Sequence, residues 1–168
     1  MLIRSATIDD APEIARIHVE SWRVAYRGQI PEVVLAAQNV EQRAAFWRDR
    51  LTPCSSSVFV AEQGSVIGFC DLIPSRDKDS GPKVAEIGGM YVHPSHWRKG
   101  IGRALCRRVL AEAERQGFEL VTLWVLATNG PAQSFYEAMG FALDGAAKTE
   151  LLADGSELHE IRFRRQAG

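Results

Sequence analysis

One stretch of the sequence, residues 90–105, constrains the fold more than any other. It begins with apolar, strand-like residues, passes a proline turn and a basic Gly-x-Gly loop, and runs directly into a long amphipathic helix. Glycines let the backbone approach a ligand closely, and the start of a helix offers N–H groups without partners inside the helix. A strand, a glycine loop and a helix in this order predict a site for an anion such as a phosphate.

The charges along the predicted helix favour the same interpretation. Basic residues gather at its N-terminal end, and Glu112 and Glu114 lie near its C-terminal end. The helix dipole prefers the opposite order, so a bound anion would compensate for this cost. The alternative is a solvated basic face that binds nothing. The basic residues are Arg98, Lys99, Arg103, Arg107 and Arg108.

The overall composition is that of an ordinary globular protein, and we expect residues 1–168 to form one domain. The net charge of −1 gives no reason to expect nucleic acid as a partner, and no run is long enough to span a membrane. The N-terminus does not read as a signal peptide. Cys54, Cys70 and Cys106 are far apart with no C-x-x-C pair, which indicates reduced thiols, no metal knuckle and a cytoplasmic location.

Periodicity predicts a mixed α/β chain. Strands are expected at residues 2–6, 58–61, 66–73, 84–92, 119–127, 141–147 and 157–164. Four main helices are expected, with a short helical piece at 32–37: one from the N-cap Asp9 to Gly28, one from Asn39 to Leu51, one over 100–116 and one from Asn129 to Gly140. Polar loops are expected at 52–57 and 74–83, and Asp154-Gly155 suits the turn of the last hairpin.

Two local patterns stand out. His18, Trp22 and Tyr26 are spaced four apart, so they lie on one helix face. They are either ordinary packing residues or one wall of an acceptor pocket. Gly88 and Gly89 interrupt the strand at 84–92, and paired glycines in a strand indicate a bulge or a place where something approaches the backbone.

Several familiar sites are excluded. The loop is not a Walker A motif, because Lys99 precedes Gly100. It is not a dinucleotide fingerprint either, since Leu105 occupies the place of the third glycine, which argues against an oxidoreductase. His93 and His96 lack the spacing of metal ligands, and no Ser/His/Asp or Cys/His arrangement can be picked out.

With these elements in order, the chain resembles the GNAT acetyltransferase superfamily over essentially its whole length. Two motifs carry the resemblance. One is the strand end Val92-His93-Pro94 followed by Arg98-Lys99-Gly100-Ile101-Gly102-Arg103-Ala104, which is similar to the family's pyrophosphate loop. The other is residues 129–141, which are similar to the family's N-x-x-A-x-x-F-Y-x-x-x-G-F helix. One residue departs from the pattern: Trp97 stands where the family usually has Gln or Arg.

The resemblance implies a mixed, largely antiparallel sheet of about six to seven strands with about four helices, splayed between the fourth and fifth strands. It implies acetyl-CoA as the acyl donor and no metal. The pantetheine arm would pair with the backbone of Met90, Tyr91 and Val92, and Asn129, a helix cap by position, would also touch it. The pyrophosphate would lie on Arg98, Lys99, Gly100, Ile101, Gly102 and Arg103.

The resemblance also implies two proton-transfer residues. Tyr136 matches the family's general acid, which protonates the departing sulfur of CoA. Glu86, fourteen residues before Gly100, matches the general base of histone-type members, acting directly or through a water. A backbone N–H at the Gly88-Gly89 bulge could polarise the thioester carbonyl. The alternative for Tyr136 is a core aromatic residue, and for Glu86 a surface strand residue.

We therefore expect an N-acetyltransferase that moves an acetyl group directly to a primary amine of a small molecule or a peptide. The alternative is a non-catalytic acyl-CoA-binding or regulatory module on the same fold, against which Tyr136 and Glu86 argue. The acceptor pocket would be built from the first two helices, the 74–83 loop and the last hairpin, with Trp22 and Tyr26 as candidate substrate contacts. A homodimer is compatible with the resemblance.

Overall fold

The computed structural model describes residues 1–52, 57–152 and 154–168. Cys54 and most of the loop expected at 52–57 lie outside these ranges. None of the helices in the described ranges has an apolar run long enough to cross a membrane.

Within the described residues, seven strands form one sheet in the order β1-β2-β3-β4-β5-β7-β6. Every neighbouring pair is antiparallel except β4 and β5, which run parallel. The predicted mixed, largely antiparallel sheet is therefore confirmed. The strands are β1 (Leu2–Ser5), β2 (Ser57–Glu62), β3 (Val66–Pro74), β4 (Val84–Val92), β5 (Leu120–Leu126), β6 (Ala142–Leu151) and β7 (Glu157–Gln166).

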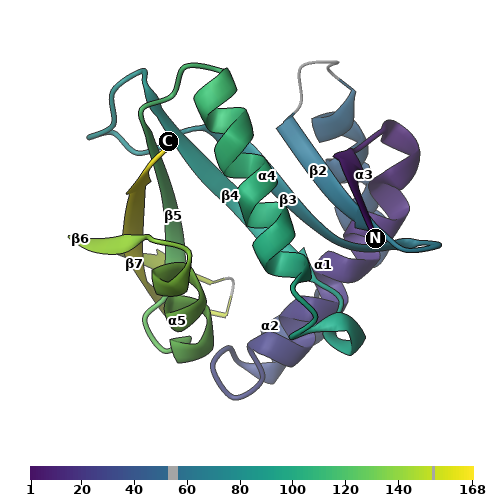
Figure 1. The fold of residues 1–168 in the computed structure, drawn as a ribbon. Helices are drawn as coiled ribbons and strands as arrows, with labels where there is room; N and C mark the ends of the chain where they lie inside the picture. The colour runs from purple at the N-terminus through teal and green to yellow at the C-terminus, as the bar shows by residue number, and fades with distance from the viewer. Residues whose placement is uncertain (53–56, 153) are drawn as a thin grey trace.

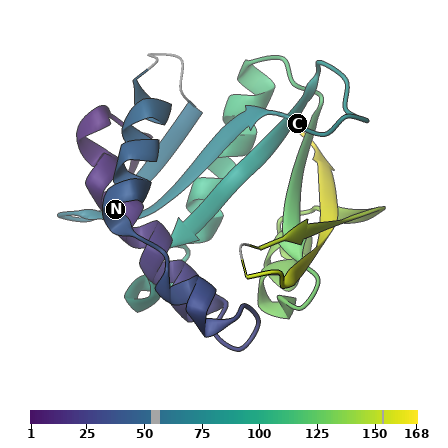
Figure 2. The same cartoon turned by 180° about the vertical axis from the view of Figure 1, so that it is seen from behind.

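The helices cover both faces of the sheet (Figures 1 and 2). Buried side chains of α4 and α5 pack on one face, and those of α1 and α3 pack on the other, against β2 and β3. The α-helices are α1 (Ala11–Ala25), α2 (Glu32–Ala36), α3 (Val40–Leu51), α4 (Ile101–Arg115) and α5 (Gly130–Ala138), with 3-10 turns η1 (Ile8–Asp10) and η2 (Pro94–His96). The five α-helices of the described ranges are the four main helices expected and α2, which is the short helical piece expected at 32–37.

The sheet opens between β4 and β5, as the resemblance implied. These strands pair only at Val84↔Leu120, Ala85↔Val121 and Glu86↔Thr122. Beyond Glu86 they diverge, and Figures 1 and 2 show β5 and β7 leaning away from β3 and β4. We call this opening the fork. One half of the sheet carries α1, α3 and α4, and the other carries α5.

A β-bulge confirms one interpretation of the glycine pair in β4. Asp71 of β3 lies opposite Gly89, whereas Leu72 lies opposite Ile87, so Gly88 is the extra residue. A Cβ at Gly88 would stand 2.9 Å from Oδ2 of Asp71. Real Cβ contacts are not that short, so a side chain at this position would force the Asp71 carboxylate to move.

The capping predictions are partly right. Asp9 is not the N-cap of α1, because it lies inside η1. The residue before α1 is Asp10, whose carboxylate accepts the Thr7 N–H at 2.7 Å and pairs with Arg4 at 2.7 Å. Asn39 does cap α3, since its side chain accepts the Gln42 N–H at 2.9 Å.

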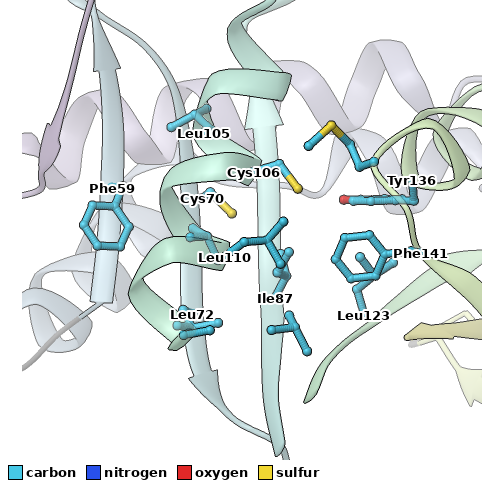
Figure 3. Close-up of a cluster of buried hydrophobic side chains, with 14 of the residues drawn as sticks. Phe59, Cys70, Leu72, Ile87, Leu105, Cys106, Leu110, Leu123, Tyr136 and Phe141 are labelled. Atoms are coloured by element: carbon cyan, nitrogen blue, oxygen red, sulfur yellow. The ribbon is translucent and has the colours of Figure 1, made fainter. Parts of the chain in front are cut away.

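The main core lies between α4 and the sheet. Leu105, Val109 and Ala113 are fully buried on the predicted apolar face of α4. Figure 3 shows this face packed over β2 to β4, with Tyr136 and Phe141 closing the cluster from the α5 side. The core therefore joins the two halves of the sheet where the fork begins.

Candidate active site

The edge of β4 that borders the fork presents backbone groups. The His93 N–H donates to the Ile67 carbonyl at 2.9 Å, so in this antiparallel ladder Tyr91 also exchanges its backbone bonds with β3. The intervening residues Met90 and Val92 then direct their N–H and C=O groups to the opposite edge, where β5 has diverged. Of the three residues expected to pair with a pantetheine arm, Met90 therefore offers its N–H and C=O to the fork and Tyr91 does not. Val92 offers its N–H, whereas its carbonyl already accepts hydrogen bonds from Trp97 and Ser21.

A basic loop lies between β4 and α4. Gly100 has a φ of +80° and directly precedes α4, and Arg98 has a φ of +60°. The first N–H groups of α4, from Ile101 to Arg103, have no partner inside the helix, because the first intrahelical bond is from Ala104 to the Gly100 carbonyl. These N–H groups and the exposed basic side chains around them form a cradle that suits a pyrophosphate.

The cations of this loop are available to a ligand. Lys99 donates to the Ser95 carbonyl at 3.1 Å, and no carboxylate in the described part of the chain pairs with Arg98, Lys99 or Arg103. Arg108 is different, because it pairs with Glu112 at 3.0 Å and lies over the Phe59 ring. Arg108 is therefore a structural residue of α4.

Trp97, which departs from the family motif, ties the loop to β4. Its side chain is 41% exposed, and its indole N–H donates to the Val92 carbonyl at 2.6 Å. The Ser21 hydroxyl donates to the same oxygen at 3.1 Å. Trp97 and Ser21 together therefore occupy the Val92 carbonyl and tie the loop and α1 to the end of β4.

Tyr136 lies at the inner end of the fork. It is 9% exposed, packs edge-on against Phe135 and Phe141, and points its hydroxyl from α5 toward Cys106 on α4 (Figure 3). Burial, with the Cys70 and Cys106 thiols nearby, raises the pKa of Tyr136 well above 10. The hydroxyl therefore keeps its proton at neutral pH, as a proton donor requires.

Glu86 lies at the branch point of the fork, in the last β4 pair with β5. It is only 2% exposed, so it is not a surface residue. Both carboxylate oxygens bind Arg76: Oε1 lies 2.5 Å from Nη2, and Oε2 accepts the Nε–H at 3.2 Å and the backbone N–H at 3.1 Å. In this arrangement Glu86 is neutralised by a bidentate ion pair.

Asp71, which faces Glu86 across the bulge region, is a site residue that the sequence did not predict. It is 6% exposed in the middle of β3, and its Oδ1 has no hydrogen-bond partner within the described residues. Burial raises its pKa to about 6. The charges of Arg50 and Arg76 act to lower this pKa, and the charge of Glu86 acts to raise it. One signal could have indicated it, since it is the only charged residue in an otherwise apolar strand pattern at 66–73.

The aromatic row on α1 reaches the site through Tyr91. The Trp22 indole donates to the Tyr91 hydroxyl at 2.8 Å, and Trp22 packs edge-on against Tyr26. His18 stacks on the Tyr91 ring with centroids 4.8 Å apart, and burial lowers its pKa to about 3, so it is neutral. The row is a packing cluster that also flanks the bulge.

A charged network anchors the loop after β3 to the last hairpin. Arg162 pairs with Asp77 at 3.1 Å, Asp79 at 2.7 Å and Asp144 at 2.7 Å. The Trp124 indole donates to Asp77 at 3.1 Å. The segment that carries Arg76 is therefore held against β5, β6 and β7.

Asn129 is confirmed as a helix cap, because its side chain accepts the Ala132 N–H at 3.2 Å at the start of α5. No three His, Cys, Asp or Glu side chains gather as metal ligands anywhere in the described ranges. The structure thus brings the β4 edge, Glu86 and Tyr136 to the fork and links Trp22 and Tyr26 to it through Tyr91.

Comparisons with known proteins give a consistent result. The profile of the acetyltransferase (GNAT) family matches residues 12–141. The chain is 32% identical over 161 residues to the Bacillus subtilis (strain 168) protein named uncharacterized N-acetyltransferase YuaI, covering 95% of this chain and 89% of that protein.

Two solved structures share the fold. One is the PaiA N-acetyltransferase of Thermoplasma acidophilum in complex with coenzyme A, with a TM-score of 0.77, 20% identity and 98% of each chain covered. The other is YncA of Salmonella typhimurium with its cofactor acetyl-CoA, with a TM-score of 0.74, 24% identity, and 99% of this chain and 94% of that one covered.

Proposed function

Because the chain belongs to the GNAT acetyltransferase family, we propose that it transfers an acetyl group directly from acetyl-CoA to a primary amine of a small molecule or a peptide. The observation that carries the proposal is the fork itself. It combines an open β4 edge, an anion cradle at the start of α4 and a buried tyrosine hydroxyl at the inner end.

The residues around the fork fit acetyl-CoA, which when bound supplies the thioester that the amine attacks. The N–H and C=O of Met90 and the N–H of Val92 would pair with the pantetheine amides. The α4 N–H groups would hold the pyrophosphate together with Arg98, Lys99 and Arg103. Gly100 leaves room for it, whereas a Cβ at Gly102 would lie 3.5 Å from the Phe135 ring, so Gly102 lets α5 approach α4. A Cβ at Gly100 would meet nothing within 4 Å, which supports an open cradle.

Tyr136 and Glu86 are the proposed proton-transfer residues from the family pattern. Tyr136 would give its proton to the departing sulfur, and its raised pKa keeps that proton in place until then. Glu86 would act as general base, directly or through a water, when Arg76 releases it. Arg76 is largely exposed, at 65% of its side chain, so the pair can open toward solvent.

The acceptor would enter on the face of the sheet that carries α1, between Trp22 and Tyr26 and the loop held by Arg162. A wall of aromatic rings suits an amine attached to an apolar or aromatic group. We also propose that the 168 residues form one catalytic domain acting in the cytoplasm, where the free, buried Cys70 and Cys106 would stay reduced.

The test is a free-thiol release assay with acetyl-CoA against a panel of amines that includes amino acids, polyamines and peptide N-termini. The proposal expects thiol release that depends on at least one amine. Tight CoA binding without turnover on any amine would instead favour the non-catalytic acyl-CoA-binding module.

A further inference from the structure

A buried carboxylate at the fork lacks a full set of partners. Asp71 is 6% exposed, and its Oδ1 accepts no hydrogen bond from any described residue. The nearest cations are engaged elsewhere, since Arg76 binds Glu86 and Arg50 donates to the Leu72 carbonyl at 3.4 Å. Leaving a buried charge unsatisfied is costly, so this atom calls for an explanation.

The two glycines of the bulge lie directly against the buried carboxylate. A Cβ at Gly88 would stand 2.9 Å from Oδ2, and one at Gly89 would stand 3.4 Å from Oδ1. Gly88 is itself exposed. Neither glycine therefore places a side chain against Asp71, and only the backbone of β4 lies next to the carboxylate at these two positions.

The Asp71 carboxylate also lies on the face of the sheet where the acceptor would enter, close to the point where β4 leaves β5. Cys70 and Leu72 belong to the core beneath α4, so Asp71 points to the opposite face, which carries α1 and α3. Its bulge begins two residues beyond Glu86, where β4 leaves β5. The Tyr91 ring flanks the bulge, 3.4 Å from the Cβ position of Gly89.

We propose that Asp71 is a further catalytic residue, which binds the ammonium group of the acceptor and accepts its proton. This rests on the proposed acetyl transfer. An ammonium group would supply the hydrogen bond that Oδ1 lacks and the charge that the buried carboxylate lacks. In this assignment Asp71 replaces Glu86 as the base for the acceptor amine, because both Glu86 oxygens bind Arg76.

The charges around Asp71 suit a base that works near neutral pH. Burial and Glu86 of β4 favour its protonated form, whereas Arg50 of α3, Arg76 after β3 and the Gly89 N–H favour its ionised form. The result is a pKa of about 6. A base with a pKa near the working pH is both ionised and basic enough to take a proton.

The proton balance is complete. Asp71 takes one proton from the ammonium, and the free amine forms the C–N bond as the C–S bond breaks with its electron pair on sulfur. Tyr136 gives its proton to that sulfur, and the surplus proton of the new amide restores the Tyr136 hydroxyl. Asp71 then releases its proton to water, so one proton is produced per acetyl group transferred.

The experiment compares kcat/KM across pH for the wild type, Asp71→Asn and Glu86→Gln, with the best amine from the thiol-release panel. Asp71→Asn keeps the shape and removes the base, and Asp49→Asn, which changes an exposed carboxylate on α3, is the matched control. We expect Asp71→Asn to lower kcat/KM about 100-fold or more near pH 7, with unchanged CoA affinity. We also expect the acid limb of the profile, with a pKa near 6 in the wild type, to disappear.

The outcomes separate the two proposals. Wild-type turnover with an unchanged acid limb and activity within about twofold in Asp71→Asn would overturn the role of Asp71 alone. Loss of the acid limb in Glu86→Gln but not in Asp71→Asn would assign the base to Glu86 instead. No amine-dependent turnover by the wild type would refute the proposed function, and the role of Asp71 with it.

Discussion

Replacing Asp71 with asparagine is expected to stabilise the folded protein at neutral pH. Burial raises the pKa of this carboxyl from its ordinary 3.8 to about 6, against the opposing charges of Arg50 and Arg76. Because the folded-state pKa lies above the unfolded value, the group's stabilising contribution is complete below pH 3.8. It is lost as the pH rises through about 6.

The size of this effect follows from the pKa difference. At about 1.4 kcal/mol per pH unit, moving the pKa from 3.8 to about 6 corresponds to ~3 kcal/mol of lost stability at high pH. By the same linkage relation, ~2 kcal/mol of this stability is lost as the pH rises from about 4.5 to 7.5. Asparagine fills the same space without the charge, so the variant escapes this loss.

The assay is urea unfolding of the wild type, Asp71→Asn and the exposed control Asp49→Asn over that pH range. Other carboxylates, such as Asp10 and Glu112, whose pKa values are lowered by their arginine partners despite the opposing effect of burial, are common to all three proteins and cancel in the difference. The free energy of unfolding of Asp71→Asn minus that of the wild type should grow by ~2 kcal/mol as the pH rises from about 4.5 to 7.5. A difference that is independent of pH, or a variant less stable than the wild type at the higher pH, would show that burial does not raise the pKa of Asp71.

Three further changes test other parts of the account. Tyr136→Phe should lower kcat about 100-fold or more while the CoA dissociation constant measured by calorimetry stays the same, and unchanged turnover would exclude its role as general acid. Gly100→Ala and the control Gly64→Ala both place a side chain at a φ of +80°, and each should lower the free energy of unfolding in urea by ~1–2 kcal/mol. Only Gly100→Ala should weaken CoA binding, and equal CoA affinities of the two variants would argue against the cradle. Leu105→Ala, at a fully buried site on α4, should destabilise the protein by ~2–5 kcal/mol, and a loss below ~1 kcal/mol would mean that α4 is not packed as described.

Much of the fold could be predicted because its signals are local. The strand at 84–92 was predicted with its observed bounds, since apolar residues on both sides of the glycine pair mark one continuous strand. The bulge at Gly88 follows from the cost of two glycines inside a strand. The capping side chains of Asn39 and Asn129 also act within three residues, so their roles were readable.

The contacts that decide the chemistry could not be predicted, because they depend on the register between distant segments. The Glu86 carboxylate meets Arg76 only because β3 and β4 pair antiparallel across a bulge. Asp71 meets Gly88 for the same reason. The prediction of Asp9 as N-cap was wrong, because Asp9 lies in a 3-10 turn that precedes α1. Asp10 directly precedes α1, but its carboxylate binds Thr7 and Arg4 and not the N–H groups of α1.

The anion cradle shows an intermediate case. The charge pattern placed five basic residues at the start of α4, but it could not tell ligand-facing cations from structural ones. Arg108 turns out to pair with Glu112, whereas Arg98, Lys99 and Arg103 have no carboxylate partner in the described ranges. The sequence indicated no role for Trp97, because its hydrogen bond to the Val92 carbonyl depends on how the loop folds back onto β4.

A single-turnover experiment tests whether the acetyl group passes from acetyl-CoA to the amine at the fork without first bonding to the protein. The protein, in excess over acetyl-CoA, is mixed with the amine that gave the fastest thiol release, and the masses of the protein and of the amine are then measured by mass spectrometry over time. We expect the amine to gain one acetyl group for each thiol released, while the protein mass stays unchanged at every time point. An acetyl group that accumulates on the protein before it reaches the amine, or thiol release without an acetylated amine, would contradict direct transfer.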